Sequence, residues 1–256
     1  MTLLQVDDMS KAFGANQVIE GLSFGVSPGA IHSIIGPNGA GKTTLFNLIT
    51  GIYRADRGRV LFDGRDVTAL QPHELAKCGI SRTFQNLQVF LNMSALENVM
   101  AGMHLHSDHR FWPSLFHLPM ITRRDRELAE EARRLMAFVN LEDYLDAHAS
   151  AMPYGALKRL EIARALATKS KLMLLDEPAA GLNPSETRAI DGLIQKIAES
   201  GVTVILVEHD MRLVMGVSDH ILVLEGGRKL AEGTAGEIRH NPDVVAAYLG
   251  ESARKQ

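Results

Sequence analysis

Short apolar segments, separated by turns that contain glycine, recur towards both ends of the chain and predict β-strands. Residues 3–26 alternate in part between apolar and polar positions, and residues 60–62 run into Asp63-Gly64, a pair typical of a tight turn. These two segments predict an antiparallel β edge. Other segments predict strands that are buried within a sheet, at residues 31–35, 172–175, 202–207 and 221–224.

Between these groups of strands the apolar positions follow helical spacing. In one segment they recur on a single helical face, with arginine and glutamate between them, at Leu128, Ala132, Leu135, Met136 and Val139. Two further helices are marked by their ends. One runs from Thr43 to Thr50 and stops before Gly51, and the other opens with the capping sequence Asn183-Pro184-Ser185-Glu186 and stops at Gly201.

Strands that alternate with helices predict an α/β fold with a mostly parallel sheet core, an antiparallel β subdomain and a helical subdomain. We expect a single domain over residues 1–250 and a tail at 251–256. Within the domain, we assign the core with its antiparallel edge to residues 1–90 and 168–230, the helical subdomain to 91–167 and a C-terminal extension to 231–250.

The composition is that of an ordinary globular domain. Apolar residues make up 46% of the chain and charged residues 22%, which is ample for a large buried core. The formal net charge of −3 gives no basic surface of the kind that nucleic-acid backbones require, so we expect no nucleic acid partner. The single cysteine, Cys78, fits a reducing compartment, and we find no signal peptide or membrane-spanning segment. We therefore expect cytoplasmic folding.

A glycine-rich loop lies between the strand at 31–35 and the helix that follows it. Glycines let backbone N–H groups converge on phosphate oxygens, and the helix adds its positive N-terminal end, which is the design of a P-loop. Lys42 would reach the β- and γ-phosphates, and Thr43 would ligate Mg²⁺. The alternative is a chance glycine turn. We assign ATP binding to Gly36, Pro37, Asn38, Gly39, Ala40, Gly41, Lys42, Thr43 and Thr44.

Two acidic residues, Asp176 and Glu177, directly follow the apolar strand at 172–175 and are therefore expected at its carboxyl end, where open parallel sheets bind ligands. We expect Asp176 to hold Mg²⁺ and Glu177 to polarise the water that attacks ATP. His209 also follows a buried strand and is expected to hold the γ-phosphate and orient water. The alternatives are a solvated acid pair and a structural histidine.

Several motifs resemble the ABC ATPase family in their order and spacing over essentially the whole chain: Arg82-Thr83-Phe84-Gln85-Asn86, Tyr154-Gly155, the segment 159–166, the segment 174–178 and His209. The resemblance implies ATP and Mg²⁺ as cofactors, and a dimer in which Tyr154 and Gly155 of one subunit complete the ATP site of the other. It also implies that Gln85 contacts Mg²⁺ and water and senses transmembrane subunits. Phe13 would stack on adenine, although a buried strand phenylalanine is an alternative.

The signature segment departs from the commonest family pattern, because Met152-Pro153-Tyr154-Gly155-Ala156 stands where Leu-Ser-Gly-Gly-Gln is usual. Pro153 has neither a hydroxyl nor an N–H to offer, and Ala156 lacks an amide side chain, so these contacts are not carried over. A Pro-Tyr-Gly segment is similar to the subfamily that energises uptake of branched-chain amino acids. Residues 84–99 and 233–250 resemble the same subfamily.

The resemblance therefore implies the ATPase subunit of an importer, located peripherally at the cytoplasmic face of the membrane. Its expected partners are transmembrane permease subunits, a solute-binding protein and a second ATPase subunit, either a copy or a paralogue. The expected cargo is branched-chain amino acids, with other small amides or urea as alternatives.

Two rival classes are less consistent with the sequence. A soluble ABC ATPase of DNA repair or translation usually carries two cassettes or long coiled coils, whereas this chain has one cassette and no sustained heptads. A GTPase switch would need an Asn-Lys-x-Asp motif, which we do not find.

Residues 103–121 resemble an insertion in one of two paralogous ATPase subunits of that subfamily. Three interpretations stay open for it: a metal site, a contact with a membrane or another subunit, and a locally packed loop. Irregular spacing and two prolines argue against a metal site formed by His104, His106, His109 and His117.

Overall fold

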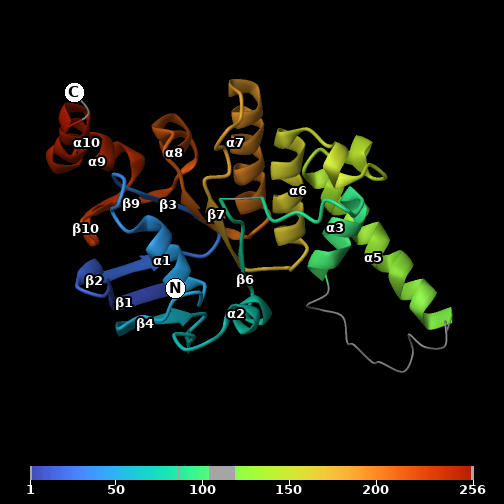
Figure 1. Ribbon diagram of the computed structural model, residues 1–256, viewed down its shortest axis with the longest axis horizontal. Helices are drawn as coiled ribbons and strands as arrows, with labels where there is room; N and C mark the ends of the chain where they lie inside the picture. Colours follow the sequence, from blue (N-terminus) through green and yellow to red (C-terminus); the bar gives the residue numbers. More distant parts are fainter. Residues whose placement is uncertain (1, 86, 104–118, 255–256) are drawn as a thin grey trace.

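The computed structural model describes residues 2–85, 87–103 and 119–254, with the stretches 119–125 and 249–254 described as backbone. Most of the 103–121 insertion lies outside the described residues, so its three interpretations stay predictions. Asn86 also lies outside them. The described chain forms two sheets with helices packed around them (Figure 1).

The larger sheet is mostly parallel, as predicted. Over the described residues its strands run in the order β10-β9-β3-β8-β7-β6, and every neighbouring pair except β9 and β10 is parallel. Because β3, β7 and β8 are parallel, the segments that follow them emerge at the same end of the sheet. The bounds are β3 Ile31–Ile35, β6 Ile80–Arg82, β7 Leu172–Asp176, β8 Thr203–Val207, β9 His220–Glu225 and β10 Arg228–Gly233.

The smaller sheet is antiparallel and confirms the predicted β edge. Its strands within the described chain run in the order β2-β1-β4-β5, with bounds β1 Leu4–Phe13, β2 Asn16–Val26, β4 Arg57–Phe62 and β5 Arg65–Asp66. Helix α1 (Lys42–Ile49) lies between the two sheets, and its buried Leu45 and Phe46 share one core with Leu4 of β1 and Ile34 of β3. Helix α2 (Pro72–Cys78) follows β5.

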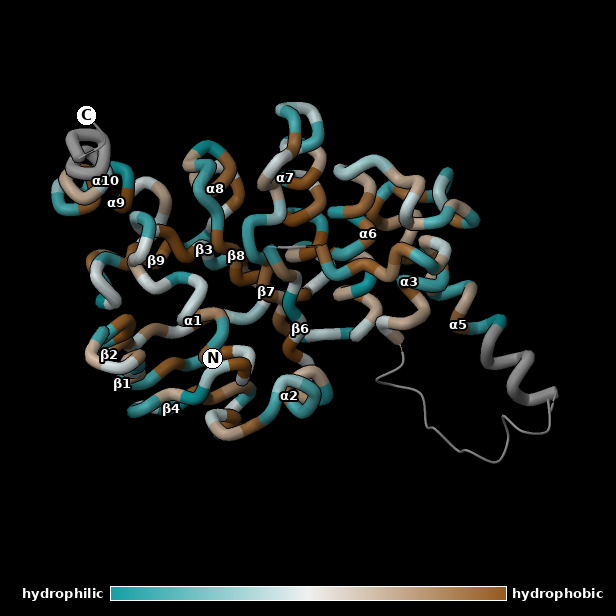
Figure 2. The backbone as a smooth tube through the Cα atoms, viewed as in Figure 1, coloured by the Kyte–Doolittle hydropathy of each residue, from teal (hydrophilic) through white to brown (hydrophobic). Residues whose placement is uncertain are grey.

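Strand β7 contributes alternate side chains to two different cores. Leu172 and Leu174 belong to the core that holds α1 and the antiparallel sheet, whereas Met173 and Leu175 belong to the core on the other face. Strand β8 divides in the same way. Figure 2 shows hydrophobic residues concentrated along these central strands. Burial on both faces is what an uninterrupted apolar segment predicts.

Helices cover the second face and extend it into the predicted helical subdomain. Met136 of α5 and Leu160 of α6 are fully buried in the same core as Leu175, so the subdomain is continuous with the sheet. The predicted cap at Asn183 is confirmed, since its side chain accepts hydrogen bonds from the next helix's first N–H groups. The bounds are α3 Ala95–Gly102, α5 Pro119–Phe138, η2 Glu142–Tyr144, η3 Ala149–Ala151, α6 Tyr154–Leu166, α7 Pro184–Glu199 and α8 Met211–Val217.

The C-terminal extension packs beside β9 and β10 (Figure 1). Helix α9 (Ala235–Arg239) and helix α10 (Pro242–Arg254) contribute Ile238 and Val244 to a small core with Ile221 and Val223. Within the described residues, no helix has the length and apolar character needed to cross a membrane. The residue boundaries assigned to the domain and its parts stay a prediction.

Strands β3 and β9 bring two histidines side by side. His32 and His220 are register partners whose ring centroids are 5.2 Å apart, and Nε2 of the buried His32 accepts a hydrogen bond from the Ser27 N–H at 3.2 Å. Burial, with repulsion from His220 as a second cause, lowers the pKa of His32 from 6.5 to about 4. The folded protein therefore favours neutral His32.

A depressed histidine pKa stabilises the fold above the unfolded pKa, and this stability is lost as the pH falls. The free energy of unfolding should therefore fall by on the order of 2–3 kcal/mol between about pH 6.5 and about pH 4 because of His32. In His32→Gln this part of the pH dependence should disappear. Urea unfolding at about pH 6.5 and at about pH 4 measures this difference in the free energy of unfolding. His73→Gln, at an exposed position of α2, should keep the wild-type slope, and an unchanged slope in His32→Gln would contradict the prediction.

Candidate active site

The glycine loop directly follows β3, and three glycines with positive φ give it its shape: Gly36 at +152°, Gly39 at +80° and Gly41 at +100°. A β-carbon at Gly36 would collide with the carbonyl oxygen of Leu224, and one at Gly41 would lie 2.6 Å from Cδ1 of Ile19. Gly39 has open space, so its backbone conformation alone favours glycine there. The loop is therefore fitted closely against β2 and β9.

Lys42 begins α1 and folds back over the glycine loop. Its buried ammonium group donates hydrogen bonds to the carbonyl oxygens of Gly36 at 2.7 Å and Pro37 at 3.0 Å. Thr43 is exposed and Thr44 is half-buried in the first turn of the helix. The structure describes this turn in full, and the turn contains no acidic side chain. A fixed cation, two hydroxyl groups and a helix N-terminus thus meet at one place, and together they can hold an anion such as a phosphate.

Glu177 lies at the end of β7 between Gln85 and His209. Its Oε1 is 2.9 Å from Nε2 of His209, and its Oε2 accepts a hydrogen bond of 3.2 Å from Nε2 of Gln85. The chain turns sharply here, with φ at +48°, while the Glu177 N–H still donates to the Val207 carbonyl at 2.9 Å. The structure therefore brings together three of the residues to which the sequence gives catalytic roles.

Asp176, the last residue of β7, is buried and forms an ion pair with Arg82 at the end of β6. The distance between Asp176 Oδ2 and Arg82 Nη2 is 2.7 Å, and the two side chains are only 4% and 7% exposed. The Asp176 N–H also donates to the Thr83 hydroxyl at 3.3 Å. The sequence predicts a magnesium role for Asp176 but gives none to Arg82, whose partner lies on a distant segment of the chain.

The oxygen atoms in this region suit Mg²⁺. The candidates are the Thr43 hydroxyl, the Asp176 carboxylate and the Gln85 side-chain amide, and hard oxygen ligands are those that Mg²⁺ prefers. The amide nitrogen of Gln85 is turned towards Glu177, so the amide oxygen is the atom that remains for a cation. These side chains therefore fit the predicted cation, and magnesium ligation by them stays a prediction.

Glu208 is a second site residue that sequence reasoning missed. Its carboxylate is buried and accepts hydrogen bonds from the N–H groups of Ala179 at 2.9 Å and His209 at 3.1 Å. Burial raises the pKa of Glu208. The side chain thus ties the loop after Glu177 to the segment that carries His209. The signal was present in the sequence, since an acid directly follows the buried strand β8.

Phe13 ends β1 at the surface, where 44% of the residue is exposed. Tyr53, also exposed, meets it edge to face with ring centroids 5.2 Å apart and an interplanar angle of 73°. The alternative of a buried strand phenylalanine is therefore wrong. Tyr53 was not predicted, because it comes from the loop after α1 and meets Phe13 only in the folded chain.

Tyr154 and Gly155 form the first turn of α6, after Pro153. Tyr154 is exposed, whereas Gly155 is buried so closely under Glu186 that a β-carbon would lie 2.5 Å from Glu186 Oε1. Ala156 is buried as well. In Figure 1, α6 lies apart from α1, the helix that follows the glycine loop, with β7 and α7 between them.

Comparison with known proteins identifies the family. The model of a family described as ABC transporter matches residues 19–180. The chain belongs to the ABC transporter family. A second model, described as branched-chain amino acid ATP-binding cassette transporter, matches residues 228–254. As an ATP-binding cassette of this family, the chain binds and hydrolyses ATP.

Relatives and solved structures match this cassette over nearly its whole length. It is 44% identical to the high-affinity branched-chain amino acid transport ATP-binding protein BraF of Pseudomonas aeruginosa and 39% identical to LivG of Escherichia coli, with 98% of each chain covered in both cases. A solved structure of MJ1267, an ATP-binding cassette of an ABC transporter in its ADP conformation, is 35% identical with a TM-score of 0.85. It covers 98% of this chain and 99% of that one. The predicted fold class is thereby confirmed.

Gly36→Ala should disrupt the loop, because the new β-carbon meets backbone rather than a movable side chain. We expect weaker binding of a fluorescent ATP analogue and a loss of roughly 1–3 kcal/mol in the free energy of unfolding. Gly192→Ala is the matched control, since Gly192 lies on α7 with open space around it. This variant should bind nucleotide normally and gain roughly 0.5–1 kcal/mol. Wild-type binding by Gly36→Ala would contradict the expectation.

Proposed function

We propose that this chain is the ATP-hydrolysing subunit of an importer that takes up branched-chain amino acids through separate transmembrane subunits. The observation that carries the catalytic part is the position of Glu177, held between Gln85 and His209 at the same end of the sheet as the glycine loop. The cargo is supported by relatives over the whole chain that are named for branched-chain amino acid transport, and by the C-terminal family match.

Each side chain of the ATP site has a distinct role in this proposal. The loop N–H groups and Lys42 hold the β- and γ-phosphates, and Phe13 stacks on adenine. Thr43, Asp176 and Gln85 hold Mg²⁺, which when bound neutralises charge on the phosphates. Glu177 orients the attacking water and accepts its proton. His209 steadies the Glu177 carboxylate and contacts the γ-phosphate.

A second ATPase subunit, a copy or a paralogue, completes each site in this proposal. Two observations support this role: Tyr154, in the first turn of α6, is 45% exposed, and Figure 1 shows β7 and α7 between α6 and α1. With ATP held between two subunits, the closed dimer is favoured, and loss of the γ-phosphate removes that preference. This population shift drives the transport cycle.

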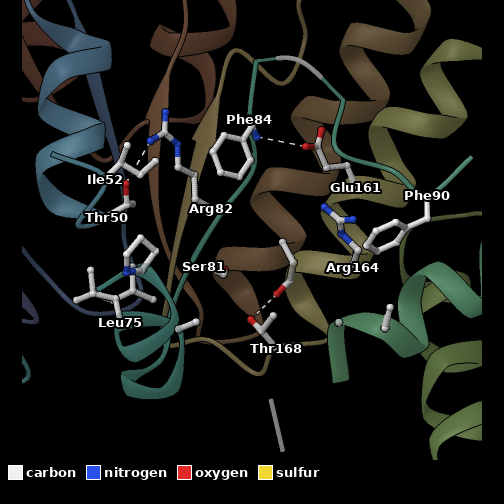
Figure 3. Close-up of a pocket in the computed structure, with 16 residues that line it drawn as sticks. Thr50, Ile52, Leu75, Ser81, Arg82, Phe84, Phe90, Glu161, Arg164 and Thr168 are labelled. Carbon is white, nitrogen blue, oxygen red and sulfur yellow. Dashed lines mark hydrogen bonds between the residues drawn. The ribbon is translucent and has the colours of Figure 1, made fainter. Parts of the chain in front are cut away.

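The permease is proposed to dock in a cleft of about 580 Å³ between the sheet core and the helical subdomain (Figure 3). Exposed Ile52, Phe84 and Phe90 give the cleft an apolar lining, and Glu161 and Arg164 add charge. Phe84 directly precedes Gln85, and its N–H donates to Glu161 at 3.2 Å. A partner seated against Phe84 therefore contacts the segment that holds Glu177 through Gln85.

This docking makes the chain a peripheral subunit at the cytoplasmic face of the membrane. A solute-binding protein would deliver the amino acid to the permease on the opposite face. Small amides or urea are the alternative cargoes that an uptake assay distinguishes.

The proposal predicts that the chain co-purifies from solubilised membranes with transmembrane subunits. In vesicles, that complex should accumulate labelled leucine when ATP is supplied. Phe84→Ala should lose the permease but keep ATP binding, because its side chain lines the cleft. Val245→Ala, which removes an exposed apolar side chain on α10, should keep both. Recovery of ribosomes or DNA-repair factors in place of transmembrane subunits would overturn the importer proposal, and uptake of urea without leucine would overturn the cargo.

Glu177→Gln should keep ATP binding and lose the group that accepts the proton from water. We expect turnover to fall by about 10²–10⁴-fold and a closed dimer to accumulate with ATP. Phosphate release and gel filtration with ATP measure the two effects. Glu199→Gln, at an exposed position near the end of α7, should leave both unchanged. Near-normal turnover of purified Glu177→Gln would show that the base is another residue.

A further inference from the structure

Arg82 joins three elements around the ATP site. Its Nη2 lies 2.7 Å from Asp176 Oδ2 on β7, and its Nη1 donates to Asn47 Oδ1 at 2.6 Å and to Thr50 Oγ1 at 3.2 Å. Asn47 belongs to α1 and Thr50 directly follows it, so the guanidinium group holds the helix after the glycine loop against the strand that ends in Asp176. One side chain thus fixes the distance between two parts of the proposed metal site.

The Arg82 side chain is almost completely removed from water. The aromatic rings of Phe84 and Phe46 lie 5.0 and 5.5 Å from its guanidinium carbon, and its Nε is buried without a hydrogen bond among the described residues. Figure 3 shows the guanidinium group beside Thr50 and Phe84 on the wall of the cleft. A buried cation is costly unless it is paired, and Asp176 supplies the matching charge. In the same way, Arg82 supplies the positive charge that offsets the burial of the Asp176 carboxylate.

The pair has a geometric consequence for Asp176. Arg82 engages Oδ2, and the described part of the chain provides no side-chain hydrogen bond to Oδ1. A carboxylate that is held at one oxygen loses rotational freedom and can present the other oxygen in a fixed direction. Partners of this kind orient metal ligands and contribute to metal affinity.

We propose that Arg82 is a positioning residue of the ATPase, which orients the Asp176 carboxylate for a divalent cation and fixes it relative to α1. The inference deepens the proposed function and rests on it, because it presumes that Asp176 serves the cation of MgATP. In this role Arg82 acts through Asp176, the residue with which it forms an ion pair.

Binding of Mn²⁺, a paramagnetic substitute for Mg²⁺, tests this role without relying on turnover. With a non-hydrolysable ATP analogue, electron paramagnetic resonance should show the dissociation constant of Mn²⁺ rising on the order of ten-fold in Arg82→Gln. Affinity for the analogue in EDTA should stay at the wild-type value. Arg82→Lys keeps the charge without the forked geometry, so its Mn²⁺ affinity should lie between that of the wild type and that of Arg82→Gln. Arg59→Gln, which breaks the more exposed ion pair with Asp7, is the control and should bind Mn²⁺ normally.

Three results would overturn the inference. Unchanged Mn²⁺ affinity would show that Asp176 needs no orientation, and tighter Mn²⁺ binding would show that Arg82 acts as a competing cation. An equal loss of analogue affinity in EDTA would show a merely structural role. If Arg82→Gln does not fold, Asn47→Ala provides the test, because it removes one hydrogen-bond partner of Arg82. Asn47→Ala should weaken Mn²⁺ binding by a smaller factor than the roughly ten-fold expected for Arg82→Gln, and unchanged or tighter binding would overturn the inference. Failure of the wild-type protein to bind Mn²⁺ with the analogue would instead refute the proposed function.

Discussion

Strand β7 has to bury alternate side chains in two cores and still bring two carboxylates, Asp176 and Glu177, to its carboxyl end. Leu172 and Leu174 face the core around α1, and Met173 and Leu175 face the core of the helices. With apolar packing on both faces, the strand has little freedom to slide, since a shift of one residue would exchange its two faces. The positions of Asp176 and Glu177 are therefore set by hydrophobic packing several residues earlier.

The site carries its charges at low solvent exposure, and specific partners compensate them. Asp176 is matched by Arg82, Lys42 is held by two carbonyl groups, and Glu208 accepts backbone N–H groups. Each partner lowers the free-energy cost of burying the charged group and also fixes the orientation of its side chain. Burial of the Lys42 ammonium group also makes its attraction for a polyanionic ligand stronger than it would be in water.

The sequence predicts the parts of this site that are local. The glycine loop can be recognised because its glycines, Lys42 and Thr43 are contiguous, and Glu177 and His209 because each follows a buried apolar strand. The apolar segments likewise predict the buried strands β3, β7, β8 and β9, but they do not indicate the order of these strands in the sheet. By contrast, Arg82 meets Asp176 across ninety-four positions of the chain, and no local pattern indicates that pairing. Tyr53 meets Phe13 for the same kind of reason, through the packing of the loop after α1 on the antiparallel sheet.

Each of the four consecutive residues from Arg82 to Gln85 makes a polar contact, and together these contacts reach three residues on distant segments: Asp176, Glu161 and Glu177. Arg82 pairs with Asp176, the Thr83 hydroxyl accepts the Asp176 N–H, the Phe84 N–H donates to Glu161 of α6, and Gln85 donates to Glu177. Inserting or deleting a single residue would misalign all of these contacts at once, whereas many individual side chains elsewhere can be exchanged. The length of this short segment is thus constrained more tightly than its composition. That length sets the spacing between the helical subdomain and the two acids, Asp176 and Glu177.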